Sequence, residues 1–201
     1  YGKFQKHYDA ALDAVSGMSP VLPAAEREAN LAKMLEGSQI KQRLYHGTGD
    51  DIKEFRNSRI GAMGPGTYVA ESPQNASAYS TITNRKGSAN QANVMPVYVQ
   101  TKNPFVISDV NNSSEELFKY FDPTGKLSDD EVIKKVLDAG YDSIYAKGTG
   151  EINVLDPRRI KSATGNRGTY DITDPDISKA KGGAILKHRT LRNRMANQRV
   201  R

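Results

Sequence analysis

The sequence predicts an α+β fold built on strongly bent β-sheets with a few small helices around them. Three observations lead to this prediction. The apolar segments are short and numerous, Gly, Pro, Asn and Asp residues separate them, and few segments have helical spacing. The chain has 201 residues, 37% hydrophobic and 26% charged, which suffices for one domain with a real core and some additional segments.

The chain begins with two predicted helices. Residues 3–16 place apolar side chains three to four positions apart until Gly17 ends the pattern. Residues 23–35 form the second helix, because Pro23 suits a helix start and apolar residues recur after it. Together these helices make up a predicted N-terminal appendage, residues 1–39.

Short apolar runs predict the strands of a central domain, residues 40–175. The predicted strands are residues 43–46, 67–70, 94–99, 104–107, 142–145 and 151–155. Pro96 lies inside the strongest of these runs. Because proline has no N–H for a ladder hydrogen bond, we expect this strand at a sheet edge or beginning near Pro96.

Capping residues predict the helices of this domain. Ser72 is a good N-cap and Pro73 a good first residue for a helix over residues 73–80. A short helix is expected at residues 114–120, inside the polar segment 109–128.

Ser128 and Glu131 have the spacing of a capping box, and Gly140 ends the helix that they open. Asp129 and Asp130 lie in the first turn of this helix. We therefore interpret the acidic cluster as a capped helix start and not as a metal site.

Composition excludes several kinds of chemistry. The chain has no Cys, which rules out thiolate catalysis, cysteine-bound zinc and disulfides, and three His make a histidine-rich metal site improbable. No metal ligands are predicted. No apolar run approaches the roughly 20 residues that span a bilayer. The start lacks an initiator Met and an apolar signal core, so we expect a piece of a longer polypeptide or a processed product.

The net charge of +6 is unevenly distributed. Residues 177–201 carry eight Lys or Arg and no Asp or Glu, so the rest of the chain is close to neutral. This basic tail, assigned to residues 176–201, is predicted to be partly flexible or helical. Such a charge density favours non-specific contact with nucleic-acid phosphates, although residues 177–201 contain no aromatic side chain for base stacking.

Candidate site residues occur in four places along the chain. His46 ends a predicted strand and is followed by Gly47 and Thr48, Tyr68 lies in the run Gly-Thr-Tyr-Val-Ala, Tyr79 follows eleven positions later, and Glu151 opens a late strand. Each of them alone is typical of an ordinary structural residue. Their order and spacing together indicate a shared site.

The order of strand-end His, paired Tyr and late Glu resembles the His-Tyr-Glu class of ADP-ribosyltransferases, which includes diphtheria toxin and the poly-ADP-ribose polymerases. Residues 141–144 (YDSI) and the block 153–170 (NVLDPRRIKSATGNRGTY) are similar to its phage and bacterial branch, found as cassettes in polyvalent proteins. The resemblance covers residues 43–175. It implies two strongly bent, packed sheets and the use of NAD as substrate, without a metal.

The resemblance also implies roles for the matched residues. The His46 imidazole would donate to a ribose hydroxyl of NAD, the Gly47 backbone would meet the nicotinamide carboxamide, and Thr48 would add a hydroxyl contact. Tyr68 and Tyr79 would flank the nicotinamide ring by stacking. Glu151 would stabilise the positive charge that develops on the ribose as the bond to nicotinamide breaks, and His46 and Tyr79 complete the predicted catalytic set.

One departure from the arginine-modifying branch is clear. Thr149 occupies the position two residues before Glu151, where an acidic or amide residue helps to select guanidinium. Thr149 therefore argues against arginine as the modified residue and does not identify the acceptor. From the resemblance as a whole we expect mono-ADP-ribosyl transfer to a macromolecular acceptor, a host protein, in the cytoplasm of a bacterial host, with delivery from a virion left open. Two alternatives remain: an NAD glycohydrolase, and a degenerate domain that serves as a structural or nucleic-acid-binding module of a virion.

Overall fold

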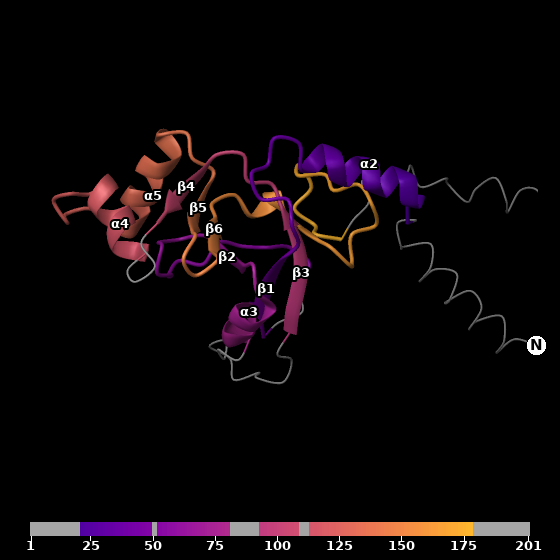
Figure 1. Cartoon of the computed structure of the whole chain (residues 1–201), viewed down its shortest axis with the longest axis horizontal. Coiled ribbons are helices and arrows are strands. Elements are labelled where there is room, and N and C mark those ends of the chain that lie inside the picture. The colour runs from indigo at the N-terminus through magenta and orange to yellow at the C-terminus, as the bar shows by residue number, and fades with distance from the viewer. Residues whose placement is uncertain (1–20, 50–51, 81–92, 109–112, 179–201) are drawn as a thin grey trace, which may run out of the picture.

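The computed structural model describes residues 21–49, 52–80, 93–108 and 113–178. The predicted helix at residues 3–16 and most of the basic tail lie outside these residues. The elements of the described part are shown in Figure 1: α2 (Ala24–Met34), β1 (Leu44–Thr48), β2 (Thr67–Ala70), α3 (Pro73–Ser80), β3 (Asn93–Val99), β4 (Pro104–Ile107), α4 (Ser113–Phe121), α5 (Asp129–Asp138), β5 (Ser143–Ala146), β6 (Glu151–Val154), a 3-10 turn (Pro157–Arg159) and β7 (Ile160–Ser162).

The strands form a single hydrogen-bonded sheet in the order β4-β5-β6-β2-β1-β3-β7. The mixed α+β class is confirmed, but the expected two sheets are one sheet here. Its halves, β4-β5-β6-β2 and β1-β3-β7, are joined between β1 and β2 by one residue pair, Tyr45 with Ala70. The other neighbouring strands share three to five pairs. A junction this narrow lets two halves bend apart while they remain connected.

The prediction for the proline-containing strand is wrong, because β3 lies inside the sheet between β1 and β7 and Pro96 is its fourth residue. The N–H of Ala163 donates to the Pro96 carbonyl at 2.9 Å. In an antiparallel ladder the nitrogen and carbonyl of one residue face the same neighbour. The Pro96 nitrogen therefore faces β7, at the position just beyond the last pair between β3 and β7, Val97 with Ser162. Because this nitrogen does not face β1, the ladder between β3 and β1 loses no hydrogen bond.

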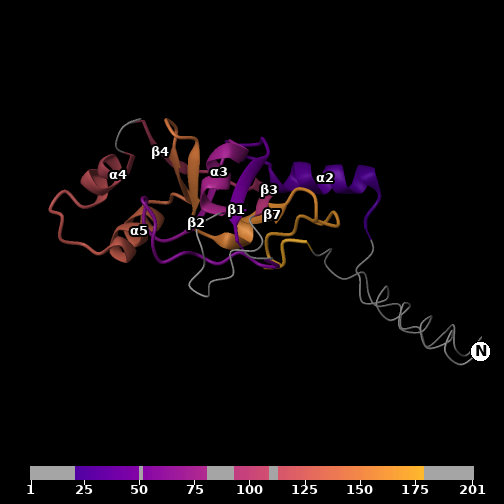
Figure 2. The same ribbon diagram turned by 90° about the horizontal axis from the view of Figure 1, so that it is seen from below.

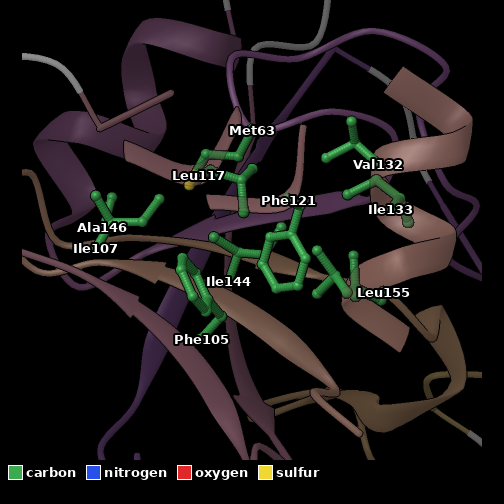
Figure 3. Packing of buried hydrophobic residues seen from close by; sticks show 11 residues of the cluster. Met63, Phe105, Ile107, Leu117, Phe121, Val132, Ile133, Ile144, Ala146 and Leu155 are labelled. Carbon is green, nitrogen blue, oxygen red and sulfur yellow. The ribbon is translucent and has the colours of Figure 1, made fainter. Parts of the chain in front are cut away.

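Alternating residues of the strands face two separate apolar clusters. On β6, Ile152 and Val154 belong to one cluster, so Glu151 and Asn153 face the other side of the sheet. The second cluster fills the space under α4 and α5, and Figure 3 shows Phe105, Phe121 and Ile144 meeting inside it. The full set of its buried residues is Met63, Phe105, Ile107, Leu117, Phe121, Val132, Ile133, Val136, Ile144, Ala146 and Leu155.

The helix that follows residue 128 begins as predicted. The Ser128 hydroxyl accepts from the Glu131 N–H, and the Glu131 carboxylate accepts from the Ser128 N–H at 2.8 Å. Helix α5 ends at Asp138 with Ala139 as its C-cap, and Gly140 follows with a φ of 87°, in the left-handed region that favours glycine. Helices α4 and α5 connect the parallel strands β4 and β5 and lie at the opposite end of the molecule from α2 (Figure 2).

Helix α2 is attached to the segment that follows β7. The Leu22 N–H donates to the Arg167 carbonyl at 2.9 Å, and the Asn30 amide donates to the Gly168 carbonyl at 3.0 Å. The same segment continues into the core, where Ile177 is 2% exposed. The packed part of the chain therefore includes α2 and extends to Ile177.

A buried lysine holds this last segment in place. Lys161 on β7 is 1% exposed, and its ammonium donates to the backbone carbonyls of Asp174 and Asp176. Burial lowers its pKa, and nearby aspartates, Asp174 first, oppose that shift. Lys161 thus serves as a hydrogen-bond donor inside the fold.

Helix α3 packs directly on β1 at Gly47. A Cβ added to Gly47 would lie 1.7 Å from the Ala76 carbonyl oxygen and 3.1 Å from the Ser80 nitrogen. These are backbone atoms of α3, so they cannot move aside as a flexible side chain can. The absence of a side chain at Gly47 therefore sets how closely α3, which carries Tyr79, approaches the sheet.

Gly47→Ala is expected to lower the free energy of unfolding by about 1–3 kcal/mol, the range for forcing a methyl group into a packed core. Gly49→Ala is the matched control, because its Cβ would make only an ordinary 3.7 Å contact with the Ser80 carbonyl. Urea unfolding of the two variants and the native chain measures the difference. Equal stability of the two variants would show that α3 does not depend on close contact at Gly47.

Candidate active site

A cavity of about 610 Å³ lies where β1 and β2 separate. Past the single pair of Tyr45 with Ala70, the remaining residues of the two strands face each other without pairing. All six predicted site residues line this cavity, together with residues of the β1 and β2 edges, of α3 and of the loop before β2. The lining residues are Tyr45, His46, Gly47, Thr48, Gly49, Arg56, Ser58, Ile60, Gly61, Ala62, Gly66, Thr67, Tyr68, Val69, Ala70, Ala76, Tyr79 and Glu151.

His46 bridges the gap between the separated strands. Its Nδ1 lies 2.7 Å from the Tyr68 carbonyl oxygen, and its ring meets Phe55 edge-on at 5.0 Å. Burial lowers the pKa of His46, and the hydrogen bond to Tyr68 opposes that shift. A carbonyl can only accept, so Nδ1 carries the proton.

The fixed tautomer changes the role expected for His46. In the neutral ring, a proton on Nδ1 leaves Nε2 with a lone pair, so Nε2 accepts a hydrogen bond. The sequence-based expectation that the imidazole donates to a ribose hydroxyl fits only the protonated ring, whose formation burial opposes. In the neutral form, a hydroxyl would donate to His46.

The register of β1 directs the Gly47 backbone into the gap. The backbone nitrogen and carbonyl of Pro96 face away from β1, so the pair Tyr45–Pro96 is not hydrogen-bonded. Hydrogen-bonded and non-bonded pairs alternate along an antiparallel ladder. The pair Gly47–Val94 is likewise not bonded, and the N–H and C=O of Gly47 point toward β2. Gly47 thus faces the cavity with one donor and one acceptor, while the absence of a Cβ serves its contact with α3.

Tyr68 is tied to the loop in front of it. Its hydroxyl donates to the Gly64 carbonyl at 2.7 Å and accepts from the Met63 N–H at 2.9 Å. Burial is the main reason why the pKa of Tyr68 is raised. Because the hydroxyl is used by the loop, the face of the ring is what Tyr68 offers to the cavity.

Tyr79 and Glu151 are hydrogen-bonded to each other. The Tyr79 hydroxyl donates to Glu151 Oε1 at 2.5 Å, although the two residues come from α3 and β6. This hydrogen bond raises the pKa of Tyr79 to about 12, with further contributions from burial and the negative charge of Glu151. The tyrosine therefore keeps its proton at neutral pH and orients the carboxylate.

The turn before Glu151 supports the same carboxylate. The Thr149 hydroxyl lies 3.5 Å from Glu151 Oε2, and the Thr149 carbonyl accepts from the Asn75 amide at 2.9 Å. The Glu71 N–H donates to the Gly150 carbonyl, also at 2.9 Å. Thus Glu71, which follows β2, and Asn75 of α3 fix the turn, and Thr149 stands beside the carboxylate where the arginine-modifying branch has an acid or amide.

Sequence reasoning gave no role in this site to one contributor, Asn153. Arg56 and the loop at residues 58–66 line the cavity. Asn153, which is fully buried, holds that loop from below through its side-chain amide. A polar residue in the apolar strand Glu-Ile-Asn-Val-Leu is the signal that could have drawn attention to Asn153.

Two further findings concern the described residues alone. They contain no group of three or more His, Asp or Glu side chains that could hold a metal ion. They also contain no helix long and apolar enough to cross a membrane.

Comparison with known proteins gives one family. The family model described as "ADP-Ribosyltransferase in polyvalent proteins" matches residues 36–170, which include every predicted site residue. No curated protein matches. A solved structure described as "Crystal structure of an anti-CRISPR protein" shares 13% identity at a TM-score of 0.35, covering 60% of this chain and 94% of that chain, a likeness too low to support an argument. Because the family model spans more than half of the sequence, the chain belongs to the ADP-ribosyltransferases of polyvalent proteins.

Proposed function

We propose that this chain cleaves the nicotinamide–ribose bond of NAD and transfers one ADP-ribose to a macromolecular acceptor, a host protein, as an effector of phage or bacterial origin. The observation that carries the proposal is the cavity between β1 and β2. It gathers a backbone donor–acceptor pair, two tyrosine rings, a neutral imidazole and a carboxylate. ADP-ribosyltransferases use NAD as their substrate, and the family of this chain supports that activity in general.

Nicotinamide suits the part of the cavity near Gly47. Its carboxamide has one donor group and one acceptor, which match the N–H and C=O that Gly47 points toward β2. The rings of Tyr68 and Tyr79 line the same cavity and supply aromatic faces for a planar cationic ring. His46 Nε2 then accepts from a ribose hydroxyl, and Arg56, which is exposed and paired with Glu54, offers its remaining N–H donors to the diphosphate.

Glu151 performs the chemistry in this proposal. As the bond between the anomeric carbon and the nicotinamide nitrogen breaks, its electron pair leaves with nicotinamide and positive charge develops on the ribose. A carboxylate that accepts a hydrogen bond from the ribose 2′-hydroxyl stabilises that charge. Glu151 Oε1 keeps acceptor capacity beyond the bond from Tyr79, because a carboxylate oxygen has two lone pairs. The acceptor nucleophile then bonds to the anomeric carbon.

Glu151→Gln is expected to slow nicotinamide release about 10²–10³-fold while NAD binding persists, because the amide keeps the shape and loses the charge. Glu71→Gln is the matched control. The Glu71 carboxylate accepts from Gln42 and Tyr145, and Glu71 does not line the cavity. Nicotinamide release by each variant, with binding followed by calorimetry, measures the difference. Equal rates in the native chain and Glu151→Gln would remove Glu151 from the catalytic role.

NAD labelled on its adenylate phosphate separates the alternatives. Label on a protein band of a bacterial lysate supports transfer to a protein, and label on nucleic acid would replace the host-protein acceptor. Release of nicotinamide without labelled macromolecule would favour the glycohydrolase. Neither release nor binding of NAD would favour the degenerate virion module, for which the basic tail would be the nucleic-acid contact.

Substitutions of Tyr79 separate its hydroxyl from its ring. Tyr79→Phe is expected to reduce kcat about tenfold with little change in KM for NAD, because only the hydrogen bond to Glu151 is lost. Tyr79→Ala also removes an aromatic face of the cavity and is expected to raise KM several-fold. Steady-state kinetics of both variants test this division. A KM increase in Tyr79→Phe as large as in Tyr79→Ala would contradict it.

The pH dependence follows from His46. Because its folded-state pKa lies below the usual 6.5, the unfolded chain takes up this proton first as pH falls. The stability that neutral His46 contributes is complete above pH 6.5 and declines as pH falls from there through the folded-state pKa. Nicotinamide release should decline with a midpoint below 6.5, where Nε2 becomes a donor. A native pH–rate profile that matches that of His46→Gln would show that His46 does not set the acid limb.

A further inference from the structure

The loop at residues 58–66, here the rim loop, forms one wall of the cavity. Ser58 and Gly66 close its base with two backbone hydrogen bonds, of 2.8 Å and 3.0 Å. Five of its residues line the cavity, namely Ser58, Ile60, Gly61, Ala62 and Gly66. The width of the NAD site in the proposed function therefore depends on where this loop is held.

Asn153 holds the rim loop from inside the protein. Its side-chain Nδ2 lies 3.0 Å from the carbonyl oxygen of Met63 and 3.3 Å from those of Gly64 and Pro65. Asn153 is fully buried and follows Glu151 by two positions on β6. Residues two apart on a strand face the same side of a sheet, so one short strand carries both the carboxylate and the residue that holds the wall.

The other end of the Asn153 side chain indicates that fold stability is not its main purpose. Oδ1 is buried and has no hydrogen-bond partner among the residues that the structure describes. A Cβ added to Gly66 would lie 1.7 Å from this atom, so Gly66 and Asn153 are in direct contact. A buried acceptor without a partner destabilises the fold and calls for an explanation. The contacts of Nδ2 with three successive carbonyls of the rim loop provide that explanation.

Tyr68 provides a second attachment at the same place. Its hydroxyl bonds to Met63 and Gly64, two of the residues that Asn153 contacts. Tyr68 and Asn153 are also paired across β2 and β6. The loop, the Tyr68 ring and the strand that begins with Glu151 are thus linked by side-chain hydrogen bonds.

We propose that Asn153 is a positioning residue that keeps the rim loop as a preformed wall of the NAD site. This inference rests on the proposed function for the identity of the ligand, and on the contacts above for the loop. Loss of the Asn153 amide removes its contacts with three loop carbonyls, leaves Gly64 with the bond from Tyr68 alone, and lets the wall move. NAD must then order the loop as it binds, so its affinity falls, whereas Glu151 and Tyr79 keep their own contacts.

The test compares Asn153→Leu with Asn166→Leu, because leucine keeps the branched shape of the asparagine side chain and has no polar atom. Asn166 is 6% exposed and also makes three hydrogen bonds through its side chain, to Ile177, Gly168 and Tyr170, which do not line the cavity. Asn153→Ala replaces Asn153→Leu if the latter does not fold. Hydrogen exchange of residues 58–66 reports on the wall without NAD, and steady-state kinetics of nicotinamide release report on the site.

We expect Asn153→Leu to speed exchange in the rim loop and to raise KM for NAD about tenfold, with kcat within about threefold of native. Asn166→Leu should lower stability while leaving both readouts unchanged. Unchanged exchange in Asn153→Leu, or equal KM changes in the two variants, would overturn the assignment of Asn153. If the native chain neither binds nor consumes NAD, the proposed function fails, and the exchange data alone then decide whether Asn153 holds the loop.

Discussion

The two halves of the sheet share one residue pair, Tyr45 with Ala70, and beyond it β1 and β2 separate. A continued ladder would fill the space with backbone hydrogen bonds and would leave no cavity. The separation instead turns the N–H and C=O of Gly47 toward an open space. His46 spans the gap through its bond to the Tyr68 carbonyl, so a side chain maintains the spacing that the ladder would otherwise impose.

The cavity also depends on how closely α3 approaches β1. The Ala76 carbonyl occupies the place where a side chain at Gly47 would lie, and this contact brings Tyr79 within hydrogen-bonding distance of Glu151. Gly47 thus serves two purposes, with its backbone facing the cavity and its missing side chain admitting the helix. Any other residue except proline could meet the first requirement but not the second.

Local signals made most of the fold predictable from the sequence. The capping box at Ser128 and the start of α3 at Pro73 depend on neighbouring residues, and both predictions are confirmed. The single sheet and the interior position of Pro96 depend on which strands pair, which no local pattern specifies. The same difference between local signals and distant partners applies to the site. Its predicted residues were gathered into one cavity, but the tautomer of His46 and the loop contacts of Asn153 depend on partners 22 and about 90 positions away.

The strand β6 shows why site and core need not compete for the same residues. Ile152 and Val154 are buried in an apolar cluster on one face, whereas Glu151 and Asn153 face the other side. Glu151 lies at the strand end, where its carboxylate reaches the cavity, and Asn153 lies deeper, where it is fully buried. Depth along one face therefore separates the group that meets the substrate from the group that shapes the wall. The alternation of the strand keeps both clear of the apolar cluster that contains Ile152 and Val154.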